Sequence, residues 1–420
     1  MIEATFSNLR RPELGQCRVR FPIPGNEYEE TLETLKRCGL GDVLGRDCTV
    51  DSISEKVSVL KRLEGTPVNV DELNYLAERL DGMDRRELAK FQAMTAKLGL
   101  TEMTDLIDLS MCCQSATVIT DFSDLELIGR QHVLDLEGGC SVEALEQLDH
   151  RAEAVRLIQN EACTVTPYGV VFDNGMKLER GYDGRRFPPY AAEPFSIEVQ
   201  VADRDHPENR ALDTTLFLPM PKEALSRKLT RGNCGGPEQA RLVGLRTTYQ
   251  DQSRPLPHAP QEQRVELPGG IADCFHLETD RLEDVNVLAA SLVALDSYSM
   301  DDNFYMEMLS SAAELAEPRD IQQLEKLIEN LNCFQFMPDI HTAEEYGKQC
   351  FGWQFSNKNM DELERYIDYG SLGRDKAEQE HGKFCATGYV GYDGDVSLEE
   401  LLGRASAPEE STGMEMGGMS

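Results

Sequence analysis

An internal repeat is the feature of this sequence that most constrains how the chain can fold. A strand-like run begins at Ile2, and a second run ends at the prolines that follow Phe21. The same order returns from Ile197 to the prolines that follow Leu218, about 195 positions later. A repeated order of this kind predicts two diverged copies of one folding unit rather than a single large domain.

Three further blocks keep this order, with a spacing that grows along the chain. The growth indicates an insertion of about fifteen residues in the second copy, where Tyr249 to Gln263 is rich in Gln and Pro and predicts a loop. The paired blocks are Asp71-Glu72-Leu73-Asn74-Tyr75-Leu76-Ala77 with Glu283-Asp284-Val285-Asn286-Val287-Leu288-Ala289; Asp121 and Gly129 with Asp339 and Gly347; and Asp149, Gly169, Val171 and Gly175 with Asp368, Gly388, Val390 and Gly394.

The charge distribution repeats as well. Residues 1–64 hold 11 acidic and 10 basic residues, whereas residues 65–175 hold 20 and 8. In the second half, residues 201–270 hold 9 acidic and 10 basic residues, whereas residues 271–420 hold 31 acidic and 10 basic residues. We therefore expect each copy to have a near-neutral, β-rich head and an acidic, mainly helical body.

The predicted fold class is α+β, as an elongated multi-domain chain. Copy one spans residues 1–190, with its head at about 1–64 and its body at 65–175. Copy two spans residues 191–404, with its head at about 195–270 and its body at 271–404. Residues 405–420 are small, polar and rich in Met and Gly, which predicts a disordered tail.

Helical periodicity is clearest after Asn69. Apolar residues from Val70 to Leu80 share one face, which places Asp71, Glu72, Glu78 and Asp81 outward and makes Asn69 and Glu72 a capping box. Helices are also expected over 27–38, 222–231, 320–331, 360–369 and 397–402, and a strand over 384–392.

Composition limits the classes of function. The formal net charge of −33 repels nucleic acid and anionic lipid, so direct binding to DNA or to a membrane is not expected. No apolar run approaches the roughly 18 residues of a membrane span. Twelve cysteines without a CxxC motif, and an acidic N-terminus without a signal peptide, predict reduced thiols and a cytoplasmic protein.

Motifs for catalysis are weak. The glycines from Gly39 to Gly45 lack the spacing of a dinucleotide loop, and the segment from Arg231 to Gly236 lacks the Lys-Ser/Thr end of a phosphate loop. Residues Asp393 to Asp395 lack the ligand positions of a calcium loop. Seven scattered histidines show no zinc spacing, so we expect no metal, no cofactor and no enzymatic activity. A serine or cysteine nucleophile stays open, because its partners need not be close in sequence.

Two runs carry a family resemblance. Val70-Asp71-Glu72-Leu73-Asn74-Tyr75-Leu76-Ala77-Glu78-Arg79-Leu80 resembles the central helix of ArdA-type antirestriction proteins from mobile elements of Gram-positive gut bacteria. Tyr366-Ile367-Asp368-Tyr369-Gly370-Ser371-Leu372-Gly373-Arg374-Asp375 resembles their C-terminal block. The opening strands that end near Phe21 also fit that family. Copy one keeps the helix block but has only Leu148-Asp149-His150-Arg151 at the position of the C-terminal block. Copy two keeps the C-terminal block but has Glu283-Asp284-Val285-Asn286-Val287-Leu288-Ala289 at the position of the helix block.

The resemblance implies DNA mimicry. Family members are usually homodimers that occupy the DNA groove of type I restriction-modification enzymes and block them without chemistry of their own. Here the tandem copies are expected to form either a pseudo-dimeric monomer or a homodimer. Duplex DNA carries one charge per about 1.7 Å of axis, so 33 net charges correspond to roughly 56 Å of duplex.

The expected partner is therefore a type I restriction-modification enzyme or another DNA-binding protein. The alternative is an acidic adaptor or inhibitor of a different basic defence or nucleoid protein. We expect the following carboxylates to replace DNA phosphates: Asp71, Glu72, Glu78, Asp105, Asp108, Asp121, Asp124, Glu126, Glu283, Asp284, Glu325, Glu329, Glu344, Glu345, Asp361, Glu362, Glu364 and Asp368.

Overall fold

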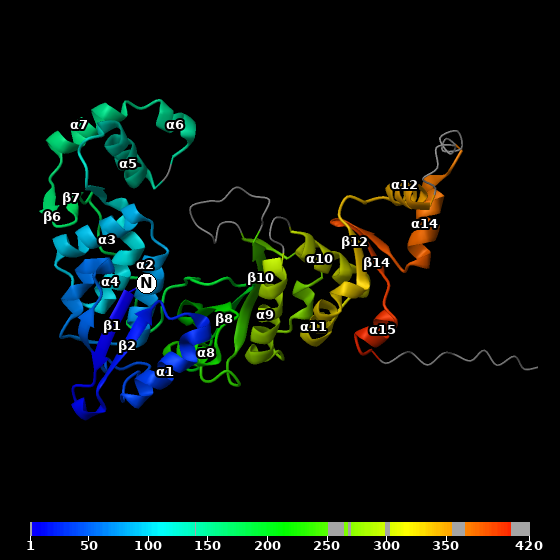
Figure 1. Ribbon diagram of the computed structural model, residues 1–420, viewed down its shortest axis with the longest axis horizontal. Helices are drawn as coiled ribbons and strands as arrows, with labels where there is room; N and C mark the ends of the chain where they lie inside the picture. The colour runs from blue at the N-terminus through cyan, green and yellow to red at the C-terminus, as the bar shows by residue number, and fades with distance from the viewer. Residues whose placement is uncertain are drawn as a thin grey trace, which may run out of the picture. The chain divides into compact units, whose positions relative to one another are not determined.

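The computed structural model describes residues 2–138, 140–250, 264–267, 270–298, 303–354 and 366–404 (Figure 1). The chain divides into two compact units. Unit 1 comprises residues 1–193, 202–216 and 220–240, and unit 2 comprises residues 194–201, 217–219 and 241–420. The second copy therefore contributes residues 202–216 and 220–240 to unit 1, so the compact units do not follow the predicted copy boundary at 190/191.

Unit 1 begins with an antiparallel sheet in the order β2-β1-β3-β4. Its alternating pattern buries Ile2, Ala4 and Phe6 on β1, because successive side chains of a strand point to opposite faces. The strands are β1 (Ile2–Ser7), β2 (Gln16–Phe21), β3 (Cys48–Ile53) and β4 (Pro67–Val68), and helix α1 (Tyr28–Arg37) follows β2.

Three helices follow this sheet: α2 (Val70–Asp81), α3 (Arg85–Leu98) and α4 (Met103–Cys112). Helix α2 begins where the sequence predicted, because the Asn69 side chain accepts hydrogen bonds from the backbone N–H groups of Asp71 and Glu72. The apolar residues of these helices and of the sheet belong to one core, which Ala224 of α8 (Lys222–Arg231) also joins. The head of copy one and the first three helices of its body thus form a single folded block.

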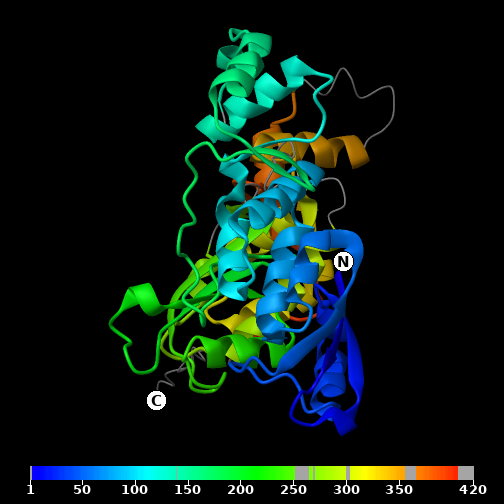
Figure 2. The same cartoon turned by 90° about the vertical axis from the view of Figure 1, so that its left-hand side faces the viewer.

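A smaller sheet in the order β5-β7-β6 completes unit 1, together with three more helices. These elements are β5 (Thr117–Ile119), α5 (Leu125–Glu137), α6 (Val142–Glu146), α7 (His150–Asn160), β6 (Thr164–Thr166) and β7 (Gly169–Phe172). Both views place α5, α6 and α7 as a group beyond α2, α3 and α4 (Figure 1 and Figure 2). A separate small core, which includes Ile128, Ala154 and Leu157, holds α5 against α7.

The sheet of the second half has the order β11-β10-β8-β9. The strands are β8 (Ile197–Val201), β9 (Thr214–Leu218), β10 (Leu242–Gln250) and β11 (Arg264–Glu266). The predicted loop from Tyr249 to Gln263 is wrong at its start, because Tyr249 and Gln250 pair with β11. The rest of that loop lies outside the described residues.

The helices of unit 2 are α9 (Leu282–Tyr298), α10 (Phe304–Ala316), α11 (Ile321–Glu329), α12 (Ala343–Gln354), α14 (Tyr369–Gln379) and α15 (Leu398–Leu401). A sheet in the order β12-β14-β13 accompanies them, formed by β12 (Phe334–Met337), β13 (Lys383–Cys385) and β14 (Gly388–Tyr392). Short 3-10 helices connect elements throughout the chain: η1 (Pro12–Leu14), η2 (Gly25–Glu27), η3 (Glu55–Leu63), η4 (Cys113–Ser115), η5 (Arg210–Leu212), η7 (Ala272–Cys274) and η8 (Leu331–Cys333).

The two halves share one order of elements, as the sequence repeat predicted. The sheet order β2-β1-β3-β4 recurs as β9-β8-β10-β11, and β5-β7-β6 recurs as β12-β14-β13. The peptide bonds before Pro22 and Pro219 are both cis. The multi-domain α+β class is therefore confirmed.

Two predicted elements near the C-terminus need correction. The predicted strand over 384–392 is a hairpin of two strands, β13 and β14, because the chain turns between Cys385 and Gly388. Of the helix predicted over 360–369, residues 360–365 lie outside the described residues, and the helix that follows begins only at Tyr369. The Asp368 side chain caps that helix by accepting from the Ser371 N–H.

Candidate partner-binding surface

The central carboxylate of α2 is buried and neutralised inside unit 1. Asp71 is 7% exposed. The Arg227 guanidinium of α8 donates to both of its oxygens, from Nε to Oδ1 and from Nη2 to Oδ2, each at 2.9 Å. This two-point geometry satisfies the carboxylate. The charge of Asp71 raises the pKa of Arg227 against the opposing effect of burial. The expectation that Asp71 faces outward to replace a phosphate is therefore wrong.

Glu72 is also internal, at 3% exposed. Its Oε1 accepts a hydrogen bond from the Tyr182 hydroxyl at 2.9 Å and lies 3.8 Å from Nη2 of Arg231. Arg231 stacks on the Phe187 ring at 4.4 Å. Glu72 makes no return bond to the Asn69 N–H, so the predicted capping box is reduced to the Asn69 cap. The prediction that Glu72 replaces a DNA phosphate is therefore also wrong.

Three more predicted carboxylates of copy one have internal partners. Asp108 is 1% exposed and accepts from the backbone N–H of Tyr182 at 2.8 Å. Asp105 is partly buried and pairs with Arg180. Glu78 is partly buried, accepts from Asn74 Nδ2 at 2.7 Å, and has its pKa raised by burial. Residues 176–193, which follow the acidic body of copy one and which we call the linker, contact these helices through Arg180, Tyr182 and Tyr190. Asp105, Asp108 and Glu78 therefore do not form an open anionic surface.

The carboxylates around α5 behave as predicted in one respect: they are exposed. Asp121 accepts from the Ser123 N–H, and this bond lowers the pKa of Asp121. Asp124 caps α5 by accepting from the Leu127 N–H at 3.0 Å, and Glu126 is exposed in the first turn. Negative charge at a helix N-terminus is favourable, so these positions stabilise the helix as well as carry charge.

The predicted carboxylates of copy two are mostly exposed. Glu283 pairs with Arg281 at 2.9 Å, and Glu344 pairs with Lys348 at 2.7 Å, which reduces the free charge of both. Glu345 accepts from the backbone of His341 and Thr342, which lowers its pKa. Asp284, Glu329 and Asp368 are exposed and Glu325 is half-buried, whereas Asp361, Glu362 and Glu364 lie outside the described residues.

Exposed carboxylates that the prediction did not name gather beside those it did. Residues 121–161, which we call the α5–α7 group, contain ten acidic and three basic residues. Asp135 bonds Lys90, and Glu153 bonds Arg156 at 2.7 Å. The other eight acidic side chains are exposed: Asp121, Asp124, Glu126, Glu137, Glu143, Glu146, Asp149 and Glu161. The charge count of the body contained this signal, but the predicted set included only Asp121, Asp124 and Glu126 of this group.

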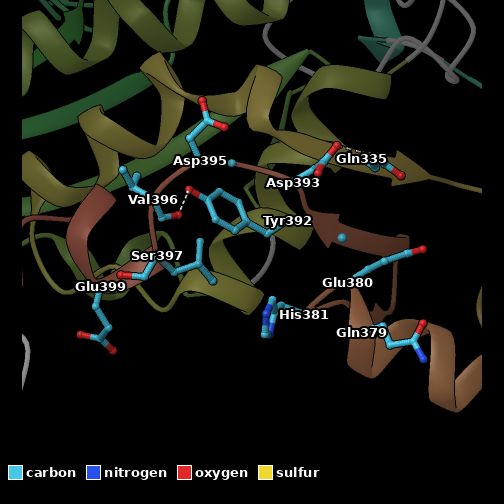
Figure 3. Close-up of a pocket in the computed structure, with 13 residues that line it drawn as sticks. Gln335, Gln379, Glu380, His381, Tyr392, Asp393, Asp395, Val396, Ser397 and Glu399 are labelled. Atoms are coloured by element: carbon cyan, nitrogen blue, oxygen red, sulfur yellow. Dashed lines mark hydrogen bonds between the residues drawn. The ribbon is translucent and has the colours of Figure 1, made fainter. Parts of the chain in front are cut away.

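A second concentration lies in residues 339–354 and 366–404, which we call the α12–α15 group. Its described residues hold eleven acidic and five basic side chains. A cavity of about 690 Å³ is lined by Glu380, Asp393, Asp395 and Glu399 together with His381 (Figure 3). The Tyr392 hydroxyl donates to the Val396 carbonyl at 2.7 Å at its edge. The cavity therefore favours cationic rather than anionic groups.

Neither a metal-binding cluster nor a membrane-spanning helix is found in the described part of the chain. No group of three or more His, Cys, Asp or Glu side chains there is arranged to hold a metal ion. Within the same ranges, no helix has the length and apolar character that crossing a bilayer requires. Comparison with protein-family models, with curated proteins and with solved structures finds no match.

Proposed function

We propose that this protein is a DNA mimic that inhibits a DNA-binding enzyme, with a type I restriction-modification enzyme as its target in the cytoplasm. The observation that carries the proposal is the set of exposed, unneutralised carboxylates of the α5–α7 group. The resemblance of the α2 and α14 sequences to ArdA-type antirestriction proteins selects the class of target.

The carboxylates stand on a folded scaffold. Glu143 and Glu146 are three residues apart on α6, and side chains at this spacing are neighbours, about 5 to 6 Å apart at Cβ. The Asp124 and Asp149 side chains are fixed because each caps a helix. A scaffold that holds its charges in place loses less conformational entropy on binding than a flexible acidic tail.

Not all of the expected carboxylates support the proposal. Asp71 and Glu72 of α2 pair with Arg227 and Arg231, and Asp105 and Asp108 of α4 pair with Arg180, so these four carboxylates do not support the proposal. The α5–α7 group and the α12–α15 group retain an excess of exposed acidic residues. Inhibition is therefore assigned to these two groups rather than to the central helix of copy one.

A competition experiment tests the proposal. A purified type I enzyme is saturated with fluorescently labelled target duplex, and the protein is titrated at low salt while polarisation is followed. We expect displacement of the duplex, and a steep loss of displacement as salt rises, because contacts between opposite charges are screened. Labelled DNA that stays bound at a large excess of the protein would refute the proposal for that enzyme.

A matched pair of triple variants locates the surface. Glu126→Gln, Glu143→Gln and Glu146→Gln remove three exposed charges from the α5–α7 group, and we expect roughly tenfold weaker competition. The control is Glu13→Gln, Glu29→Gln and Glu33→Gln, three exposed positions in the near-neutral head. Both variants change the net charge equally, so equal losses would contradict the assignment to the α5–α7 group.

A further inference from the structure

The α5–α7 group also exposes apolar side chains among its carboxylates. Leu127 is 43% exposed, Val142 is 64%, Val155 is 36% and Ile158 is 38%. Val155 and Ile158 are three residues apart on α7 and so lie on neighbouring positions of one face. Single exposed apolar residues need no explanation, but several within one small group indicate an interaction surface.

DNA mimicry alone does not require these residues, because a duplex backbone presents no aliphatic side chains to its partner. Copy two shows that the fold does not require an apolar residue at Leu127 or Val155 either. Gly129 of α5 corresponds to Gly347 of α12, because in each helix an added Cβ would meet a backbone oxygen of the neighbouring helix, that of His150 or Tyr369. Asp149 and Asp368 are both helix caps. By this alignment Leu127 corresponds to Glu345, and Val155 corresponds to Arg374.

Charge decides what can cover this surface. A second copy of the chain would bring the same excess of seven acidic residues against it, and nucleic acid or an anionic membrane would be repelled in the same way. A basic protein surface that carries apolar side chains of its own satisfies both features. Protein interfaces commonly have such an apolar centre with a polar rim.

We infer that the α5–α7 group is a mixed docking surface, on which aliphatic side chains of α5, α6 and α7 pack against apolar residues within the basic face of the target protein. This inference rests on the proposed function and specifies its partner. The surface would bind the protein target through apolar contacts that DNA itself does not make. These contacts would contribute binding free energy that salt does not screen.

The test exchanges residues between the copies. The double variant Leu127→Glu and Val155→Arg introduces the residues that copy two carries at the same places, and it leaves the net charge at −33. We expect about tenfold weaker binding to the type I enzyme, and the same fold-loss at low and moderate salt. The control is Leu44→Arg and Val287→Glu, two exposed apolar positions outside the group, which should bind like the wild type.

The outcomes separate the two proposals. Failure of the wild-type protein to bind the enzyme overturns both. Wild-type binding that the double variant matches within twofold at both salt concentrations overturns only the apolar contribution. Sedimentation of the wild type as a dimer and of the double variant as a monomer would assign the surface to a second copy instead. If the double variant does not fold, the variant Val142→Ser, at the most exposed of the four positions, tests the apolar contribution instead.

Discussion

At the residue scale, the carboxylates of α2 show how a charge can serve the fold instead of a partner. Asp71 and Arg227 have side chains that are 8% and 6% exposed. Arg227 also donates to the Gly41 carbonyl at 2.9 Å, so the guanidinium connects three segments of unit 1. Removing two charges from water is costly, and the pair persists because each group satisfies the other.

We therefore expect Arg227→Leu to destabilise unit 1 by about 3 to 5 kcal/mol, because it removes both hydrogen bonds of the guanidinium and leaves the buried Asp71 carboxylate with only Arg231, 4.0 Å away, as a cation. Urea unfolding with hydrogen exchange at the amides of α2 measures this loss. The second substitution Asp71→Leu in the same chain should restore most of the stability, because an apolar pair of similar volume needs no solvation.

The control for this prediction is an arginine in an exposed pair. Arg246 is 60% exposed and lies 3.2 Å from Glu266. Exposed pairs contribute about 0 to 1 kcal/mol, so Arg246→Leu should change stability little. Equal effects of Arg227→Leu and Arg246→Leu would show that the buried pair has no special role.

At the element scale, glycine sets the distance between the paired helices of each body. A Cβ at Gly347 of α12 would lie 2.0 Å from the Tyr369 carbonyl oxygen, and one at Gly129 of α5 would lie 1.7 Å from that of His150. Both obstacles are backbone atoms at the start of the partner helix. The paired glycines in the sequence repeat therefore mark a close helix contact that both copies keep.

Gly347→Ala should separate α12 from α14 and destabilise unit 2 by about 1 to 3 kcal/mol, because a methyl group cannot be accommodated without moving the backbone. Gly352 in the same helix is the matched control, since a Cβ there meets nothing within 4 Å. Gly352→Ala should stabilise the helix by about 0.5 to 1 kcal/mol. Thermal unfolding of the two variants gives the comparison, and the same sign for both would contradict the close contact.

At the scale of the whole molecule, the copies defined by sequence and the units defined by packing are different divisions. Helix α8 belongs to copy two by sequence, yet its Arg227 and Arg231 neutralise Asp71 and Glu72 of copy one within unit 1. The linker adds Tyr182, which bonds Glu72, and Phe187, on which Arg231 stacks. The second copy thus completes the charge balance of the first unit.

A chain that ends at Tyr190 should therefore unfold about 10 °C below a chain that ends at Ala240, because it lacks the two arginines. Circular dichroism melts measure the difference. Asp71→Asn and Glu72→Gln in the shorter chain should recover part of it, since a buried neutral amide is less costly than a buried charge. Identical melting of the two wild-type chains would show that α8 is dispensable.

Sequence alone determined the repeat, the α+β class, the start of α2 at Asn69 and the excess of acid in both bodies. These properties are local or additive: a cap acts within one turn, periodicity within one helix, and charge is a sum. Only the tertiary structure decided which acids are free. Asp71 and Glu72 look like the outer face of a helix, but α8, about 150 residues later, and the linker cover them. A pattern within one helix carries no information about a distant segment that packs on its polar side, whereas Glu126 and its neighbours stay exposed because nothing in the described structure packs over them.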